Sequence, residues 1–171
     1  MAGEKRKAGR DVAAIVVTYA LALALWTGGL VVLGAVVAPT VFRVVPAPAS
    51  GDAMTLVFRR FDGVAIACAI VVLVAEAGLA WRGGRPARLD LARAASVTLA
   101  AGLAIYEATA LAPAIADLHR RGAIRGLHED GVMLEKIHRM AETTAKAELV
   151  FLILALALLV VTRLRFHAHP T

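Results

Sequence analysis

Four apolar blocks, each of about 19 residues or more, dominate this chain of 171 residues. They cover residues 12–38, 63–81, 94–112 and 143–162. About 20 apolar residues in a helix cross the hydrocarbon core of a bilayer, which is roughly 30 Å thick. Lipid offers the backbone no partners, so a crossing segment must be a helix or part of a closed barrel, and the blocks lack the alternation of barrel strands. The sequence therefore predicts an all-α fold, an integral membrane four-helix bundle with antiparallel neighbours.

The composition agrees with a membrane protein and argues against nucleic acid as a partner. Hydrophobic residues make up 60% of the chain and charged residues 19%. A soluble domain of this size has too little interior to bury so much apolar surface. The net charge of +6 comes from basic residues that flank the apolar blocks. We therefore expect the lipid bilayer to be the partner of this chain.

The basic residues also predict an orientation. They crowd into the tail 1–11 (MAGEKRKAGRD), the connection WRGGRPARLDLAR and the tail 163–171. With four crossings in the single domain 12–162, these three segments share one side. Short basic segments favour the cytoplasmic side. We expect a multi-pass protein of the inner (plasma) membrane, with both termini cytoplasmic and with amphipathic extensions of the second and fourth helices on the other side.

Two carboxyl groups, Glu76 and Glu107, fall inside apolar blocks, where a charge costs about 2.5–3.5 kcal/mol. Glu107, with Tyr106 beside it, has two interpretations: a proton or cation relay, or a protonated side chain that hydrogen-bonds a neighbouring helix and fixes packing. Glu76 lies near the cytoplasmic end, where we expect it to pair with Arg82 or to reach headgroups. At about 1.5 Å per residue, the two carboxyls differ in depth by more than roughly 10 Å, which argues against a shared-proton pair.

Small residues predict where helices approach closely. The third block carries one every four residues along a stripe, and the first block carries a tryptophan beside two glycines near its middle. Small-xxx-small stripes and glycines allow close packing of membrane helices. The chain shows no internal repeat. The positions expected to pack are Trp26, Gly28 and Gly29 in the first block and Ala100, Ala104 and Ala108 in the third.

The connection before the fourth block holds a polar cluster of His128, Glu135, His138 and Arg139. Glu135 and His138 share a helix face, but one Glu-x-x-His without a second copy is a weak metal signal. Interfacial hydrogen bonding is the favoured interpretation. No cofactor is predicted, and haem or copper is the alternative.

Function is left open between three classes, because the chain contains no GxGxxG, Walker, HExxH or GxSxG motif that would specify an enzyme. The leading hypothesis is an accessory or stress-associated membrane factor, with a second copy of the chain or another membrane protein as partner. The second is a transport or cofactor-binding bundle that uses Glu107, helped by His128 or His138. The third is a redox enzyme with haem between helices.

The stretches APTVFRVVP, ASGDAMTLVFRRFD and EKIHRMAETTAKAELV resemble the four-helix transmembrane protein 205-like family, whose bacterial members form a domain of unknown function. The resemblance implies a four-helix topology and almost no mechanism. The only cysteine, Cys68, gives no support to the metal handling through sulfur discussed for eukaryotic relatives. The positions that match the family pattern include Phe42, Arg43, Gly51, Phe58 and Pro113.

Overall fold

The computed structural model describes residues 2–83 and 86–168, and all of their regular secondary structure is helical. Two elements are short π-helices, labelled η, which continue the α-helices on either side of them. In chain order the elements are α1 (Ala2–Val32), η1 (Leu33–Val37), α2 (Ala38–Val44), α3 (Ala49–Gly83), α4 (Arg88–Tyr106), η2 (Glu107–Leu111), α5 (Ala112–Arg120) and α6 (His128–Ala168).

Four helical stretches are long and apolar enough to cross a membrane: Gly9–Val44, Ala49–Arg82, Arg88–Arg120 and His128–Thr162. The all-α membrane fold predicted from the sequence is thus confirmed. Each stretch is longer than the apolar block inside it, because polar flanking residues continue the helix. Part of the basic N-terminal tail belongs to α1, and the amphipathic segments before the second and fourth blocks belong to α3 and α6.

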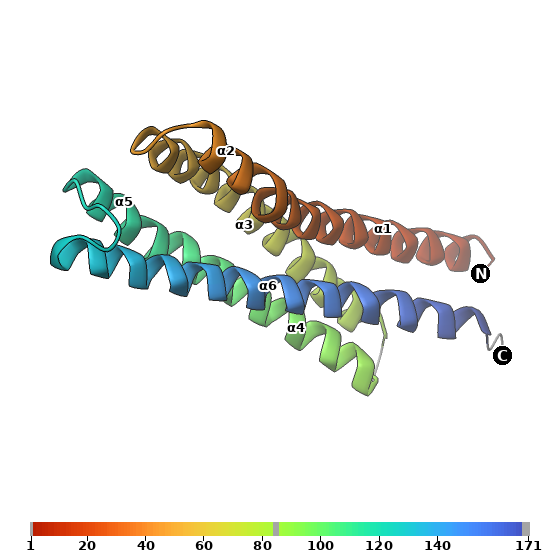
Figure 1. The fold of residues 1–171 in the computed structure, drawn as a ribbon. Coiled ribbons are helices and arrows are strands. Elements are labelled where there is room, and N and C mark those ends of the chain that lie inside the picture. Colours follow the sequence, from red (N-terminus) through yellow and green to blue (C-terminus); the bar gives the residue numbers. More distant parts are fainter. Residues whose placement is uncertain (1, 84–85, 169–171) are drawn as a thin grey trace.

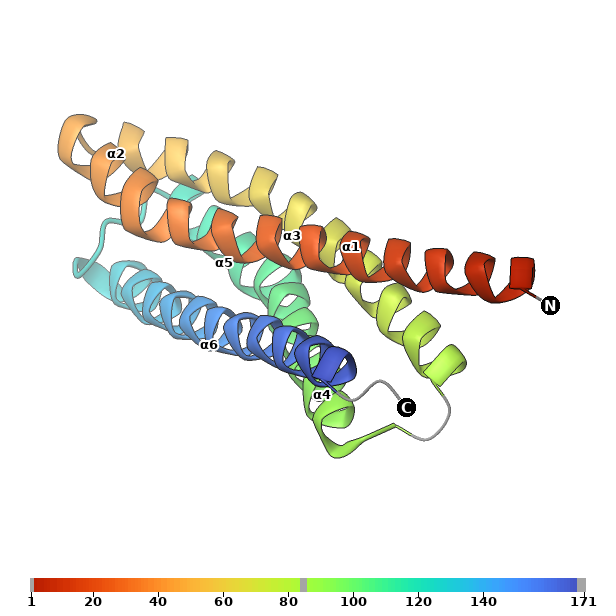
Figure 2. The same cartoon turned by 90° about the vertical axis from the view of Figure 1, so that its right-hand side faces the viewer.

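The chain reverses direction at each of its three connections (Figure 1). Both termini and the α3–α4 connection lie at one end of the bundle, which we call the terminal end. The connections from α2 to α3 and from α5 to α6 lie at the opposite end, which we call the loop end. Seen from the side, the α1–α3 hairpin lies above the α4–α6 hairpin (Figure 2). The two hairpins meet where α3 packs on α4 and where α1 packs on α6.

The first helix of each hairpin contains the same backbone irregularity, a short π-helix. The π-helix η1 is followed by Ala38 and Pro39, and η2 is followed by Ala112 and Pro113. Proline lacks an N–H and its ring clashes with the carbonyl four residues earlier, which in both hairpins belongs to the π-helix. The wider turn of a π-helix makes room for the proline without ending the helix.

The two hairpins repeat one another beyond this turn. When Pro39 is aligned with Pro113, Tyr19 falls opposite Arg93, and both are buried. In the second helices, the spacing from Asp62 to Glu76 equals that from Glu148 to Thr162. The sequence analysis missed this repeat because the aligned side chains differ in type.

The core between the hairpins is small. Its fully buried members include Tyr19, Trp26, Val72 and Leu152. Large apolar side chains are exposed on the outer surface of all four spans, as expected when lipid rather than water surrounds them.

Gly29 permits a close contact between α1 and α3. A Cβ atom on Gly29 would overlap Cε2 of Phe61, whereas one on Gly28 would meet nothing within 4 Å. Gly29→Ala should therefore destabilise the protein by about 1–3 kcal/mol, the usual cost of overpacking, and Gly28→Ala should not. Thermal unfolding in detergent, followed by exposure of the buried Cys68 to a thiol-reactive dye, measures both.

Phe61→Ala provides the control for this prediction. If the contact with the ring causes the loss, Gly29→Ala should cost much less in the Phe61→Ala background. Equal costs in both backgrounds, or equal melting temperatures for Gly28→Ala and Gly29→Ala, would contradict the proposed contact.

Candidate functional site

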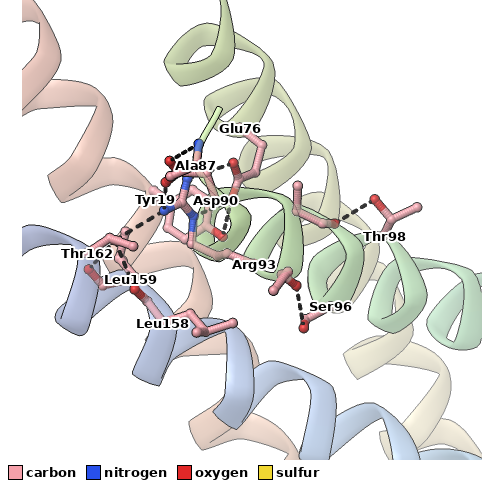
Figure 3. A network of polar contacts seen from close by, with 12 residues as sticks. Tyr19, Glu76, Ala87, Asp90, Arg93, Ser96, Thr98, Leu158, Leu159 and Thr162 are labelled. Atoms are coloured by element: carbon pink, nitrogen blue, oxygen red, sulfur yellow. Dashed lines mark hydrogen bonds and ion pairs between the residues drawn. The ribbon is translucent and has the colours of Figure 1, made fainter. Parts of the chain in front are cut away.

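A buried arginine near the terminal end joins all four long helices. Arg93 on α4, only 3% exposed, donates from Nε to Oε1 of Glu76 on α3 at 2.6 Å and from Nη2 to Oε2 at 3.1 Å. Its Nη1 donates to Oδ1 of Asp90 at 2.9 Å and to Oγ1 of Thr162 on α6 at 3.2 Å. The hydroxyl of Tyr19 on α1 donates to Oε1 of Glu76 at 2.8 Å. We call these five residues the arginine cluster (Figure 3).

The arginine cluster satisfies its own charges. The guanidinium meets a carboxylate on two of its edges and also lies 5.9 Å from the centre of the Tyr19 ring. Removing one member of a buried ion pair usually costs more than the pair itself contributes, because the remaining charge is left without a partner. The cluster therefore fixes the two hairpins against each other at the terminal end.

This arrangement corrects the expectation for Glu76. Its carboxylate pairs with Arg93 inside the bundle, and Arg82 is exposed. Arg93 had been counted with the basic connection, because in the sequence it stands just before the third apolar block. The alignment of Tyr19 with Arg93 was the signal that would have placed Arg93 in the core.

A second polar group, the carboxyl cluster, consists of Asp62 on α3, Glu107 at the start of η2 and Glu148 on α6. Glu107 is close enough to both of the others for their charges to interact. The indole Nε1 of Trp26 on α1 donates to Oε1 of Glu148 at 2.7 Å. Among the described residues, no basic side chain forms an ion pair with any of these three carboxyls.

Glu148 is the main difference from the sequence analysis at this cluster. Glu148 follows Lys146 just ahead of the apolar run, a position from which a long side chain can reach the interface. In the structure Glu148 is 2% exposed, and Trp26 holds it inside the bundle. Asp62 and Glu148 each stand 14 residues before a member of the arginine cluster on the same helix, and both were missed as site residues.

The two clusters lie at different depths. Fourteen residues separate the members of the two clusters on each of three helices, namely Asp62 and Glu76, Arg93 and Glu107, and Glu148 and Thr162. At about 1.5 Å per residue this is a separation of roughly 20 Å, on three helices independently. Glu76 and Glu107 accordingly belong to different clusters and do not form a pair.

Other expected site residues have more ordinary positions. Tyr106 is 42% exposed and takes no part in either cluster. Ala100 and Ala104 are buried on α4, which packs mainly against α6, and Ala108 is half-buried. The small stripe thus packs inside the chain. Among the remaining positions, Gly28, Phe42, Arg43, Phe58 and Pro113 are exposed and Gly51 is half-buried.

The polar cluster expected from His128, Glu135, His138 and Arg139 lies at the loop end and is only partly assembled. Glu135 accepts from Nε of Arg139 at 3.0 Å, and Nε of Arg125 lies 3.7 Å from its other oxygen. His138 packs against His119 of α5, whereas His128 is exposed. In the part of the chain that the structure describes, no group of three or more His, Cys, Asp or Glu residues is arranged to hold a metal ion.

These features define a multi-pass helical membrane protein, built from two similar hairpins with two polar clusters between them. Residues 21–123 match the sequence profile of the family described as Domain of unknown function (DUF4149), and the chain belongs to this family. Comparison with curated proteins and with solved structures found no match.

Burial should decide what each ion pair of this protein contributes to stability. Glu76→Gln should lower the free energy of unfolding by about 3–5 kcal/mol, because it leaves the buried Arg93 without its carboxylate. Glu142→Gln is the matched control: Glu142 lies 2.6 Å from Lys146, the same distance as in the buried pair, but on the exposed surface. Glu142→Gln should cost much less than Glu76→Gln, because water and salt screen the exposed pair.

The double variant Glu76→Leu/Arg93→Leu distinguishes the cost of an unpaired buried charge from the contribution of the ion pair itself. It should recover part of the stability lost in Glu76→Gln, since neither charge remains. Thermal unfolding in detergent measures all three variants, and similar losses for Glu76→Gln and Glu142→Gln would contradict the role of the arginine cluster.

Proposed function

We propose that this protein conducts protons across the membrane along the interface between its two hairpins, with Glu107 as the central proton-binding group. The convergence of Asp62, Glu107 and Glu148 inside the bundle is the observation that carries the proposal. Ionisable residues within membrane helices are costly and commonly mark proton relays. Three carboxyls without a basic ion-pair partner among the described residues would share fewer than three charges and so hold exchangeable protons.

The repeat supports the same site. Transporters built from parallel repeats place substrate and coupling-ion sites near the bilayer midplane, at the interface between repeats. Here Asp62 and Glu148 come from the second helices of the two hairpins, each 14 residues before a member of the arginine cluster, and Glu107 is the first residue of one of the two π-helices. Short π-segments inside α-helices are frequent at functional sites. In this proposal the arginine cluster, roughly 20 Å from the carboxyl cluster, is the second polar site along the proton path.

The proposal also includes the membrane in which the protein lies and the side on which its terminal end is found. The basic tails and the basic α3–α4 connection share the terminal end, which favours a cytoplasmic terminal end in the inner (plasma) membrane. The quoted resemblance to the transmembrane protein 205-like family is compatible with the four spans. An accessory or stress-associated role lacks a specific supporting feature, because the small stripe is used inside the chain.

Proton flux should depend on Glu107. In proteoliposomes with a potassium diffusion potential and an internal pH dye, the wild-type protein should conduct protons. Glu107→Gln should reduce the flux at least tenfold, because a side-chain amide does not take up and release a proton near neutral pH. Glu142→Gln, which alters an exposed carboxyl on α6 outside the cluster, should conduct like wild type.

The outcomes distinguish the hypotheses directly. Equal flux in wild type and Glu107→Gln would exclude the relay. Flux of sodium or potassium in place of protons would make the site a cation path. A wild-type protein without any flux would favour the accessory interpretation.

Orientation can be measured with single cysteines in a Cys68→Ala background. Lys7 and Glu129 are exposed at opposite ends of the bundle. A membrane-impermeant maleimide added to intact spheroplasts should label Glu129→Cys and should not label Lys7→Cys until the membrane is opened. The reverse pattern would place the terminal end outside.

A further inference from the structure

Two histidines meet at the loop end, away from both polar clusters. His119 on α5 and His138 on α6 have ring centres 5.8 Å apart and ring planes inclined by 37°. α3 covers the same place, where Oγ1 of Thr55 lies 3.4 Å from Nδ1 of His119. The ring of His119 also lies beside Gly51, where a Cβ atom would be 3.4 Å from Cε1, an ordinary van der Waals contact.

The hydrogen bonds fix which nitrogen of each neutral ring carries the proton. Thr55 donates its one hydroxyl hydrogen to the carbonyl of Gly51 at 2.8 Å, so it can only accept from Nδ1–H of His119. Nδ1 of His138 lies 2.9 Å from the carbonyl oxygen of Leu134, which can only accept. Both imidazoles are therefore Nδ1–H tautomers, and both Nε2 atoms keep a free lone pair.

Two neighbouring imidazoles with their Nδ1–H groups engaged and their Nε2 atoms free have features that metal-binding histidines share. A ligating imidazole usually donates its other N–H to a carbonyl or a similar acceptor, which fixes the tautomer and the ring orientation. With metal–nitrogen distances of about 2.1 Å, two imidazoles on one ion have ring centres roughly 5–6 Å apart. Imidazole nitrogen suits zinc, copper and nickel.

We propose that His119 and His138 bind one divalent first-row transition-metal ion through their Nε2 atoms, with water completing the coordination. The site ties α5 to α6 at the loop end. The nearest carboxylate on the same helix face, Glu135, is engaged by Arg125 and Arg139, which leaves the two imidazoles as the protein ligands. The site is independent of proton conduction through Glu107.

Cobalt(II) and zinc(II) are suitable probes. The full chain carries two more histidines in its tail, His167 and His169, whose side chains lie outside the described part, so the parent protein is the variant with both changed to alanine, purified without a polyhistidine tag. Calorimetry should show one zinc ion per chain, and the visible absorption of bound cobalt should saturate at the same ratio.

The variants test each contact separately. His119→Ala and His138→Ala should each weaken binding at least 100-fold. Thr55→Val, which keeps the shape of Thr55 but removes the acceptor of His119 Nδ1–H, should weaken it about tenfold. His128→Ala, at an exposed histidine nearby, should bind like the parent.

Several results would overturn the proposal. These are no binding by the parent, unchanged binding in His119→Ala or His138→Ala, or a loss in His128→Ala as large as in those two. His119→Gln and His138→Gln, which keep much of the side-chain volume, must also lose the ion while unfolding at the parent's temperature. If they retain it, the histidines are not the ligands.

Discussion

The absence of polar partners in lipid is the constraint on which the rest of this structure depends. A charge inside the bundle must find its partners within the same four helices, and Arg93 shows how this is achieved. Its guanidinium is matched by Glu76, Asp90 and Thr162 from three helices, while Tyr19 adds the fourth. Because these partners come from both hairpins, the arginine fixes the packing of one hairpin on the other.

The similar spacing of polar residues in the two hairpins places the polar groups at two depths. Each hairpin supplies one residue to each cluster from its second helix, at the same spacing: Asp62 and Glu76 in the first, Glu148 and Thr162 in the second. The repeat also places a π-helix and a proline in both opening helices. Near the terminal end the carboxylates of this interface are paired with Arg93, whereas farther along the three carboxyls have no basic ion-pair partner among the described residues. That contrast makes the carboxyl cluster the better place for exchangeable protons.

Much of the fold, but little of the site, could be predicted from the sequence. Hydrophobic length alone predicts four spans, because a helix rises by a constant amount per residue. Glu107 was recognised because it interrupts an apolar run. Arg93 and Glu148 were not, since each stands at the edge of its run, where a long side chain can equally well reach the interface. Sequence reasoning has no means to tell which side of a helix end faces a neighbour.

The sequence by itself determined the solvent, the number of crossings and the helical class, because these follow from composition and length summed along one segment. The tertiary structure alone decided the partners: that Glu76 meets Arg93 instead of Arg82, that Trp26 holds Glu148, and that His119 faces His138. Those contacts join residues far apart in the chain. They depend on the rotation of each helix about its axis and on its depth relative to the others, and only packing of all four helices sets these quantities.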